Sequence, residues 1–146
     1  MTLSGTLTGR LTVGASSNVL IPSNITYNDN PVTNPSSTDA MGIISERNVI
    51  ISDTAPNDLE IDGCIMAMSS SFTLKNYSTV AAKGTLSVYG GIIQKERGPV
   101  GTFNASTGTK LSGYAKDYSY DLRFATNPPP FMPNTGDYRT LSWEED

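Results

Sequence analysis

The sequence carries one pattern twice, first as Leu59-Glu60-Ile61-Asp62-Gly63-Cys64-Ile65-Met66 and then as Leu86-Ser87-Val88-Tyr89-Gly90-Gly91-Ile92-Ile93. The apolar positions and the first glycine recur after 86 − 59 = 27 residues. A repeat of this length is typical of a solenoid, in which each coil buries its apolar side chains against the next. We expect Gly63 and Gly90 to lie at equivalent corners, where a side chain would be crowded or φ positive.

Short apolar clusters on both sides of this repeat predict further strands. They lie around Leu7, Leu11, Val13, Val19, Ile21, Ile25, Ile43, Ile44, Val49, Ile50, Ile51, Phe72 and Leu74. Alternation with period two indicates half-buried strands, and about three strands per coil predict an all-β, single-stranded, right-handed parallel β-helix. We expect its coils to span residues 5–103, with residues 19–25 as a third copy of the repeated pattern and Ser23 in the glycine position.

Residues 28–40 interrupt the strand pattern with Asn, Asp, Pro, Ser and Thr. Such residues form turns, so we expect a loop extruded from one coil. Long loops on rigid scaffolds often carry binding sites, and they also occur as tolerated insertions. Both interpretations remain open for this loop.

Composition limits the classes of function. The chain of 146 residues suits a single domain, and its net charge of −4 with scattered basic residues argues against nucleic-acid binding and against a basic membrane-surface helix. Histidine is absent, and the single cysteine, Cys64, excludes an intrachain disulfide and a thiolate metal cluster. No signal peptide or apolar stretch of about 20 residues is visible. The chain is therefore expected to be intracellular or the exported part of a longer precursor.

The last quarter of the sequence differs in composition from the repeat. It contains the segment Asn127-Pro128-Pro129-Pro130-Phe131-Met132-Pro133 and the aromatic residues Tyr114, Tyr118, Tyr120, Phe124, Phe131, Tyr138 and Trp143. The proline run predicts extended polyproline-type backbone. Because a solenoid has open ends with unpaired backbone groups, we expect residues 114–146 to form a C-terminal cap that folds over one end or along one face.

Several segments share their order and spacing with a known family. They are Met41-Gly42-Ile43-Ile44, Asn48-Val49-Ile50-Ile51, Ala55-Pro56-Asn57, Arg97-Gly98-Pro99-Val100-Gly101-Thr102-Phe103, Gly113-Tyr114, Lys116-Asp117-Tyr118-Ser119-Tyr120-Asp121, Asn127-Pro128-Pro129-Pro130-Phe131-Met132-Pro133 and Ser142-Trp143. In these segments the chain resembles the C-terminal region of the DUF4900 family of uncharacterised bacterial surface proteins. Members carry a pilin-like or PilX-type N-terminus, and this sequence has no such apolar helix. The resemblance implies an exported β-helical domain linked to pilus-like or envelope structures, and it implies no chemistry.

Two groups of side chains are candidates for a site. Asp58, Glu60 and Asp62 alternate with core residues on one strand, so we expect them to point outward. They fit a solvated outer face, a Ca²⁺ site or a glycosidase-like pair. The second copy carries Thr85, Ser87 and Tyr89 at these positions, which weakens the metal and catalytic alternatives.

The second group lies in the tail and suits ligand binding. Its members are Tyr114, Tyr118, Tyr120, Asp117 and Asp121, with Lys116 and Arg123 nearby. The tyrosines are candidates for an aromatic platform that stacks on carbohydrate. The two aspartates are candidates for a buried polar network that holds the tail, and a lyase-like active site is the remaining alternative.

These observations favour a non-enzymatic structural or adhesive module of the bacterial cell envelope, including one associated with pili. The expected partners are other envelope or pilus components or surface polysaccharide, with no nucleic acid, membrane contact, cofactor or metal. The expected state is a monomer or weak self-association, at the cell surface or outside the cell. The alternatives are a carbohydrate-binding or carbohydrate-cleaving β-helix, and a bactofilin-like solenoid that stacks end to end.

Overall fold

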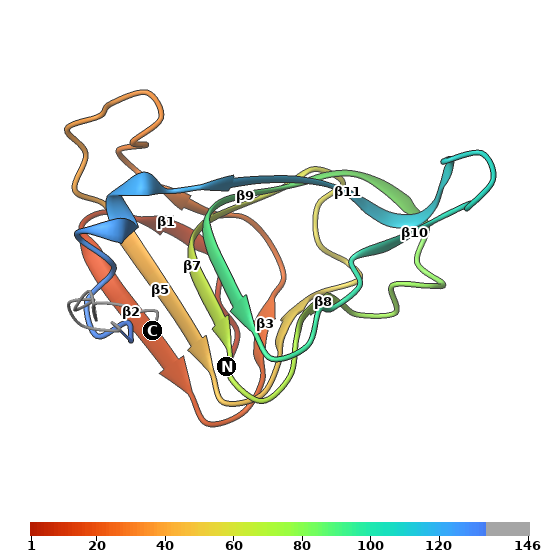
Figure 1. The fold of residues 1–146 in the computed structure, drawn as a ribbon, viewed down its shortest axis with the longest axis horizontal. Helices are drawn as coiled ribbons and strands as arrows, with labels where there is room; N and C mark the ends of the chain where they lie inside the picture. Colours follow the sequence, from red (N-terminus) through yellow and green to blue (C-terminus); the bar gives the residue numbers. More distant parts are fainter. Residues whose placement is uncertain (134–146) are drawn as a thin grey trace, which may run out of the picture.

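A computed structural model describes residues 1–133, and it is a parallel β-solenoid of about four turns (Figure 1). Its strands are β1 (Gly5–Leu7), β2 (Arg10–Ala15), β3 (Val19–Ile21), β4 (Ile25–Tyr27), β5 (Ala40–Ser45), β6 (Val49–Ile51), β7 (Leu59–Ala67), β8 (Phe72–Leu74), β9 (Ala82–Gln94), β10 (Gly101–Phe103) and β11 (Lys110–Tyr120). One 3₁₀ helix, η1 (Leu122–Ala125), follows them within the described residues. The predicted all-β fold is confirmed.

The duplicated pattern forms the longest parallel pairing of the solenoid. Strands β7 and β9 align Leu59 with Leu86 and Gly63 with Gly90, as the 27-residue repeat predicts. Strand β7 pairs with β4 before Gly63 and with β5 after it, so each glycine lies where the chain turns from one face to the next. Both glycines have positive φ, 147° and 151°.

Residues 19–25 are not a third copy of this pattern, so that prediction is wrong. Strand β3 belongs to a separate three-stranded sheet with β6 and β8, in which Val19 pairs with Val49 and Val49 pairs with Phe72. Only Ile25, in β4, stacks on Ile61. The sequence pattern failed here because alternation reports that a strand is half-buried and does not report which face of the coil it belongs to.

The stack has a continuous apolar interior. Side chains that are at most 2% exposed come from all three faces and from residues beyond the repeat: Val19, Ile21, Ile43, Val49, Ile51, Leu59, Ile61, Ile65, Phe72, Leu74, Leu86, Val100 and Tyr114. Polar side chains close the corner before the three-stranded sheet. Asn18 Oδ1 accepts from the Asn48 amide (3.1 Å), Asn48 Oδ1 from the Ser71 amide (3.2 Å) and Gln94 Oε1 from the Phe72 amide (2.9 Å).

The coils extend beyond residue 103, the predicted limit. Strand β11 pairs in parallel with β9, with Lys116 opposite Leu86 and Tyr118 opposite Val88. Residues 114–120 therefore form part of the last coil and not a cap. The sequence held one signal for this strand, because Tyr114, Tyr118 and Tyr120 keep a spacing of period two, but Lys116 interrupts the apolar row.

After β11 the chain folds back along one face of the solenoid, as the prediction for the tail allowed (Figure 1). We call residues 121–133 the strap. Phe124 and Met132 of the strap pack on Ala40, Cys64 and Met66, which lie on strands β5 and β7. The proline run is not extended, because the Met132 amide bonds to the Pro129 carbonyl (3.2 Å) and Phe131 has a φ of 59°. The remainder of the predicted cap, with Tyr138 and Trp143, lies outside the described residues.

Candidate functional site

The last coil of the solenoid is incomplete, and this leaves a cleft at its C-terminal end. Strand β11 covers the first part of β9 as far as Gly90 and then leaves the sheet at Asp121. Residues 91–94 of β9 pair with β7 on one side, and within residues 1–133 no strand pairs with their other side. Among residues 1–133, the apolar interior therefore lies open along this part of β9.

Two adjoining hollows make up this opening, which we call the terminal cleft. The first, of about 220 Å³, is lined by Val88, Gly90, Gly91, Ile92, Tyr118, Ser119 and Tyr120. The second, of about 390 Å³, is lined by Phe72, Ile92, Gln94, Arg97, Gly98, Lys116 and Tyr118. Ile92 and Tyr118 line both hollows, so they form the boundary between the two parts of one cleft.

The pairing register of β11 explains why Lys116 and Tyr118 face this cleft. Paired residues of neighbouring parallel strands point to the same side, and their partners Leu86 and Val88 are buried in the core. Within residues 1–133 no strand covers that side of the last coil, and Tyr118 is 41% exposed and Tyr120 56% exposed. Burial still raises the pKa of Tyr118, to about 12, while the charge of Arg97 lowers it.

Tyr118 and Tyr120 are thus placed together at one opening, in agreement with the aromatic platform expected from the sequence. Tyr114 is not part of it. Its ring is fully buried, and its hydroxyl donates to the Pro56 carbonyl at 2.6 Å. Asp117 pairs with Ser87 on the outer side of the sheet, where it lines a different hollow with Glu60 and Asp62. The platform predicted from three tyrosines therefore reduces to two of them, and Asp117 does not join the buried polar network predicted for it.

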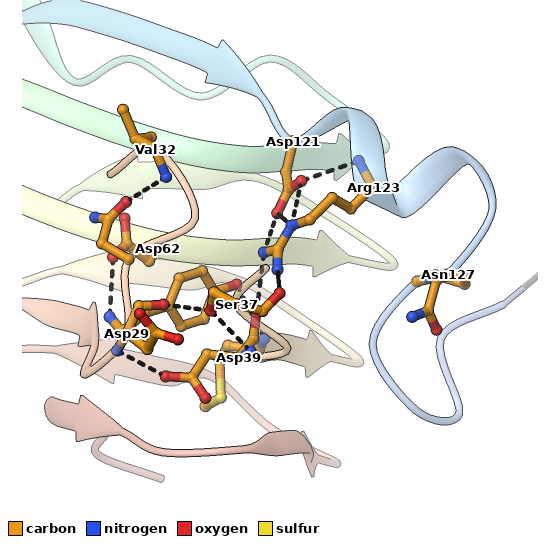
Figure 2. A network of polar contacts seen from close by, with 12 residues as sticks. Asp29, Val32, Ser37, Asp39, Asp62, Asp121, Arg123 and Asn127 are labelled. Atoms are coloured by element: carbon orange, nitrogen blue, oxygen red, sulfur yellow. Dashed lines mark hydrogen bonds and ion pairs between the residues drawn. The ribbon is translucent and has the colours of Figure 1, made fainter. Parts of the chain in front are cut away.

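Asp121 lies in the buried polar network that the sequence suggested, and Arg123 is its partner. The Asp121 side chain is fully buried, and Arg123 Nη2 lies 2.6 Å from its Oδ2. The same guanidinium donates to the backbone carbonyls of Ser37 (2.8 Å) and Asp39 (3.0 Å). Figure 2 shows Arg123 extending from the strap toward the loop that contains these two residues.

The loop at residues 28–39 is held by a second carboxylate. Asp39 is 3% exposed, and its two oxygens accept from the amides of Gly9 (2.6 Å) and Asp29 (2.9 Å). The Ser37 hydroxyl donates to the Asp29 carbonyl (Figure 2). The loop was correctly predicted to leave the coil, but sequence gave no indication that it is bonded to the strap about 85 residues later.

Asp62 does not point into solvent as predicted. Its side chain is fully buried, and Oδ2 accepts from the Tyr27 amide at 2.9 Å, next to the start of the loop. Among the described residues, Oδ1 has no hydrogen-bond partner. Burial raises the pKa of Asp62 to about 6; the Tyr27 amide lowers it, and the charges of Glu60 and Asp121 raise it. Glu60, two residues earlier, is exposed as expected.

Replacement of Asp62 by asparagine is expected to change how stability depends on pH. Because the pKa of Asp62 is raised from 3.8 to about 6, the folded state keeps a proton on Asp62 in the pH range between these two values, where the unfolded state releases it. Wild-type stability therefore falls as pH rises from about 4 to above 6, by up to about 3 kcal/mol. The Asp62→Asn variant should lack this loss, so it should match the wild type near pH 4 and exceed it at pH 8.

Urea unfolding of both proteins at a series of pH values measures this difference. The wild type and the variant share all other titrating groups, so the difference between their curves isolates Asp62. Parallel loss of stability in the two proteins would contradict the assignment. The Glu46→Gln variant is the matched control, because Glu46 is an exposed carboxylate that is not among the charges shifting the pKa of Asp62.

The Ca²⁺ alternative for Asp58, Glu60 and Asp62 has no matching ligand geometry in the part of the chain that the structure covers. No group of three or more acidic or cysteine side chains in residues 1–133 is arranged to hold a metal ion. Asp58 Oδ1 accepts from the Thr85 amide (2.8 Å), so it bonds to the neighbouring coil. Cys64 is buried beneath the strap, and burial raises the pKa of its thiol. It therefore contributes to packing beneath the strap.

Comparison with known proteins does not assign this chain to a family. No family model matches it, and no curated protein or solved structure is detectably similar to it. None of the helices in residues 1–133 is long and apolar enough to cross a membrane. The terminal cleft and the network between strap and loop are therefore interpreted from their own chemistry.

Proposed function

We propose that this protein is a non-enzymatic adhesive module of the bacterial cell envelope that binds surface polysaccharide in its terminal cleft. The observation that carries this proposal is the pair of exposed tyrosines, Tyr118 and Tyr120, at an opening in the solenoid core. Aromatic rings with one apolar face and a hydroxyl group suit the apolar faces and hydroxyl groups of sugars. The envelope location follows from the resemblance of the sequence to bacterial surface proteins.

The shape of the cleft also supports a polymeric ligand. Its two hollows adjoin at Ile92 and Tyr118 and run from Tyr120 to Arg97, so an extended chain can cross both. The cleft is open, which allows a polysaccharide to be bound along its length and not only at its end. A binding role is favoured over catalysis because, among the described residues, no carboxylate lines either hollow of the terminal cleft.

Replacement of Tyr118 by alanine is expected to weaken polysaccharide binding by about tenfold or more, and Tyr120→Ala by less. Tyr118 lines both hollows, whereas Tyr120 lines one and is more exposed. A central aromatic residue of an interface commonly contributes this much. A glycan array followed by titration of the best polysaccharide measures the effect.

Tyr77→Ala is the matched control, because Tyr77 is 38% exposed and lies on neither hollow. It should bind as the wild type does. Equal binding by the wild type and by a variant lacking both Tyr118 and Tyr120 would overturn the proposed site. A wild-type protein that binds no polysaccharide on the array would overturn the proposed function.

A further inference from the structure

The terminal cleft carries two positive charges in addition to its tyrosines. Arg97 and Lys116 both line the larger hollow, together with Tyr118. The Lys116 ammonium lies 6.0 Å from the centre of the Tyr118 ring. Two cations and an aromatic ring thus line one hollow.

Neither cation has an acidic partner in residues 1–133. The ion pairs of this part of the chain are Lys75 with Asp53 and Arg123 with Asp121. Burial lowers the pKa of Lys116, and the nearby charge of Arg97 lowers it further. Each cation therefore raises the electrostatic free energy of the other, and an anion bound between them would relieve this repulsion.

The two sides of strand β11 carry charges of opposite sign. Lys116 points to the cleft, whereas the next residue, Asp117, points to the outer face with Glu60. The protein as a whole is acidic, with a net charge of −4. An anionic polymer is therefore repelled by the outer face and attracted to the cleft, so electrostatics selects both the ligand and the place where it binds.

We propose that the terminal cleft selects anionic polysaccharides, with Arg97 and Lys116 binding the acidic groups and Tyr118 stacking on a sugar ring. This inference rests on the proposed function and names the class of its ligand. Carboxylates of uronic acids and sulfate esters share the required chemistry, because both accept charged hydrogen bonds from guanidinium and ammonium groups. The arginine can bind such a group in a bidentate manner, and the lysine acts as a point charge.

The test compares matched polymers that differ in charge. Titrations of the full chain use polygalacturonate, its methyl-esterified form, dextran sulfate and dextran. The inference predicts that each acidic polymer binds at least about tenfold more tightly than its neutral counterpart at low salt, and that added salt reduces this ratio. The two acidic polymers distinguish carboxylate from sulfate as the preferred group.

Three charge variants then locate the effect. Arg97→Gln and Lys116→Gln should each reduce binding of the acidic polymer by about tenfold and reduce binding of the neutral polymer by less, so the ratio of the two affinities falls. Lys95→Gln removes one charge nearby without touching either hollow, so it should bind as the wild type does. These three side chains are exposed, and their replacement is not expected to affect folding.

The outcomes separate the inference from the proposed function. Equal binding of acidic and neutral polymers, with loss on Tyr118→Ala, would overturn the charge selection and retain the carbohydrate site. Equal weakening by Lys95→Gln and by the two cleft variants would overturn it as well, because the attraction would then be nonspecific. Absence of binding to all four polymers would overturn this inference and contradict the proposed function on which it rests.

Discussion

Replacing Gly90 with alanine is expected to lower the free energy of unfolding by at least about 4 kcal/mol, a large part of the total stability. Gly90 has a φ of 151°, and a Cβ at this position would lie 2.0 Å from the Gly63 carbonyl oxygen. That oxygen belongs to the backbone of the neighbouring coil, so it cannot move away without breaking the pairing of β7 with β9. A domain of this size is stable by only about 5–15 kcal/mol.

Two other glycines separate the causes of this loss. Gly9 has a φ of 94° but no atom within 4 Å of its added Cβ, so Gly9→Ala should cost about 1–2 kcal/mol from backbone strain alone. Gly14 has neither positive φ nor a close neighbour, so Gly14→Ala should be within about 0.5 kcal/mol of the wild type. Urea unfolding of the three variants measures the series. A folded Gly90→Ala protein as stable as Gly9→Ala would show that the stacked corners are not closely packed.

Removal of the Arg123 side chain is expected to release the strap and the loop together. In Arg123→Ala the fully buried Asp121 loses its ion-pair partner, and the carbonyls of Ser37 and Asp39 lose their donors. An uncompensated buried charge costs about 3–5 kcal/mol. Amide hydrogen exchange should therefore accelerate in residues 28–39 and 121–133 by about 100-fold or more, while the core strands β6 and β8 keep their protection.

Two further variants test whether the buried charge causes this effect. In the double variant Asp121→Leu with Arg123→Met, no charge is left unpaired, so its loss of stability should be smaller than that of Arg123→Ala. Arg10→Ala removes an exposed arginine that bonds to Asn127 and Pro128 of the same strap, and should cost less than about 1 kcal/mol. Unchanged exchange in the loop of Arg123→Ala would contradict the proposed coupling.

The scaffold could be predicted from sequence because its core is repeated locally. Leu59, Ile61 and Gly63 recur in order as Leu86, Val88 and Gly90, and only stacking of coils buries both sets. The prediction failed where the same alternation of apolar residues is compatible with more than one face of the coil. Residues 19–21 alternate as the repeat does, yet they pair with β6 on a different face.

The candidate site was predicted in part. Tyr118 and Tyr120 were identified as aromatic binding residues, but Tyr114, four residues before Tyr118, is buried in the core. Arg97 was not among the predicted site residues, and its position with Lys116 in one hollow depends on β11 adding to the last coil. Arg97 and Lys116 are separated in the sequence by strand β10 and the turn before β11, so no residue spacing predicts that they line one hollow.

The amino-acid sequence by itself determined that this chain stacks into a β-solenoid, because repeated apolar positions and corner glycines act within and between neighbouring coils. Only the tertiary structure decided which polar groups meet solvent. Asp62 alternates with core residues and would face water on a bare coil, but the loop that begins after Tyr27 covers it. Tyr118 has the inward register of a core residue, yet it is exposed because no strand within residues 1–133 stacks on β11 at that position. Whether a side chain is exposed depends on which distant segments of the chain pack over it, and a local sequence pattern does not encode that packing.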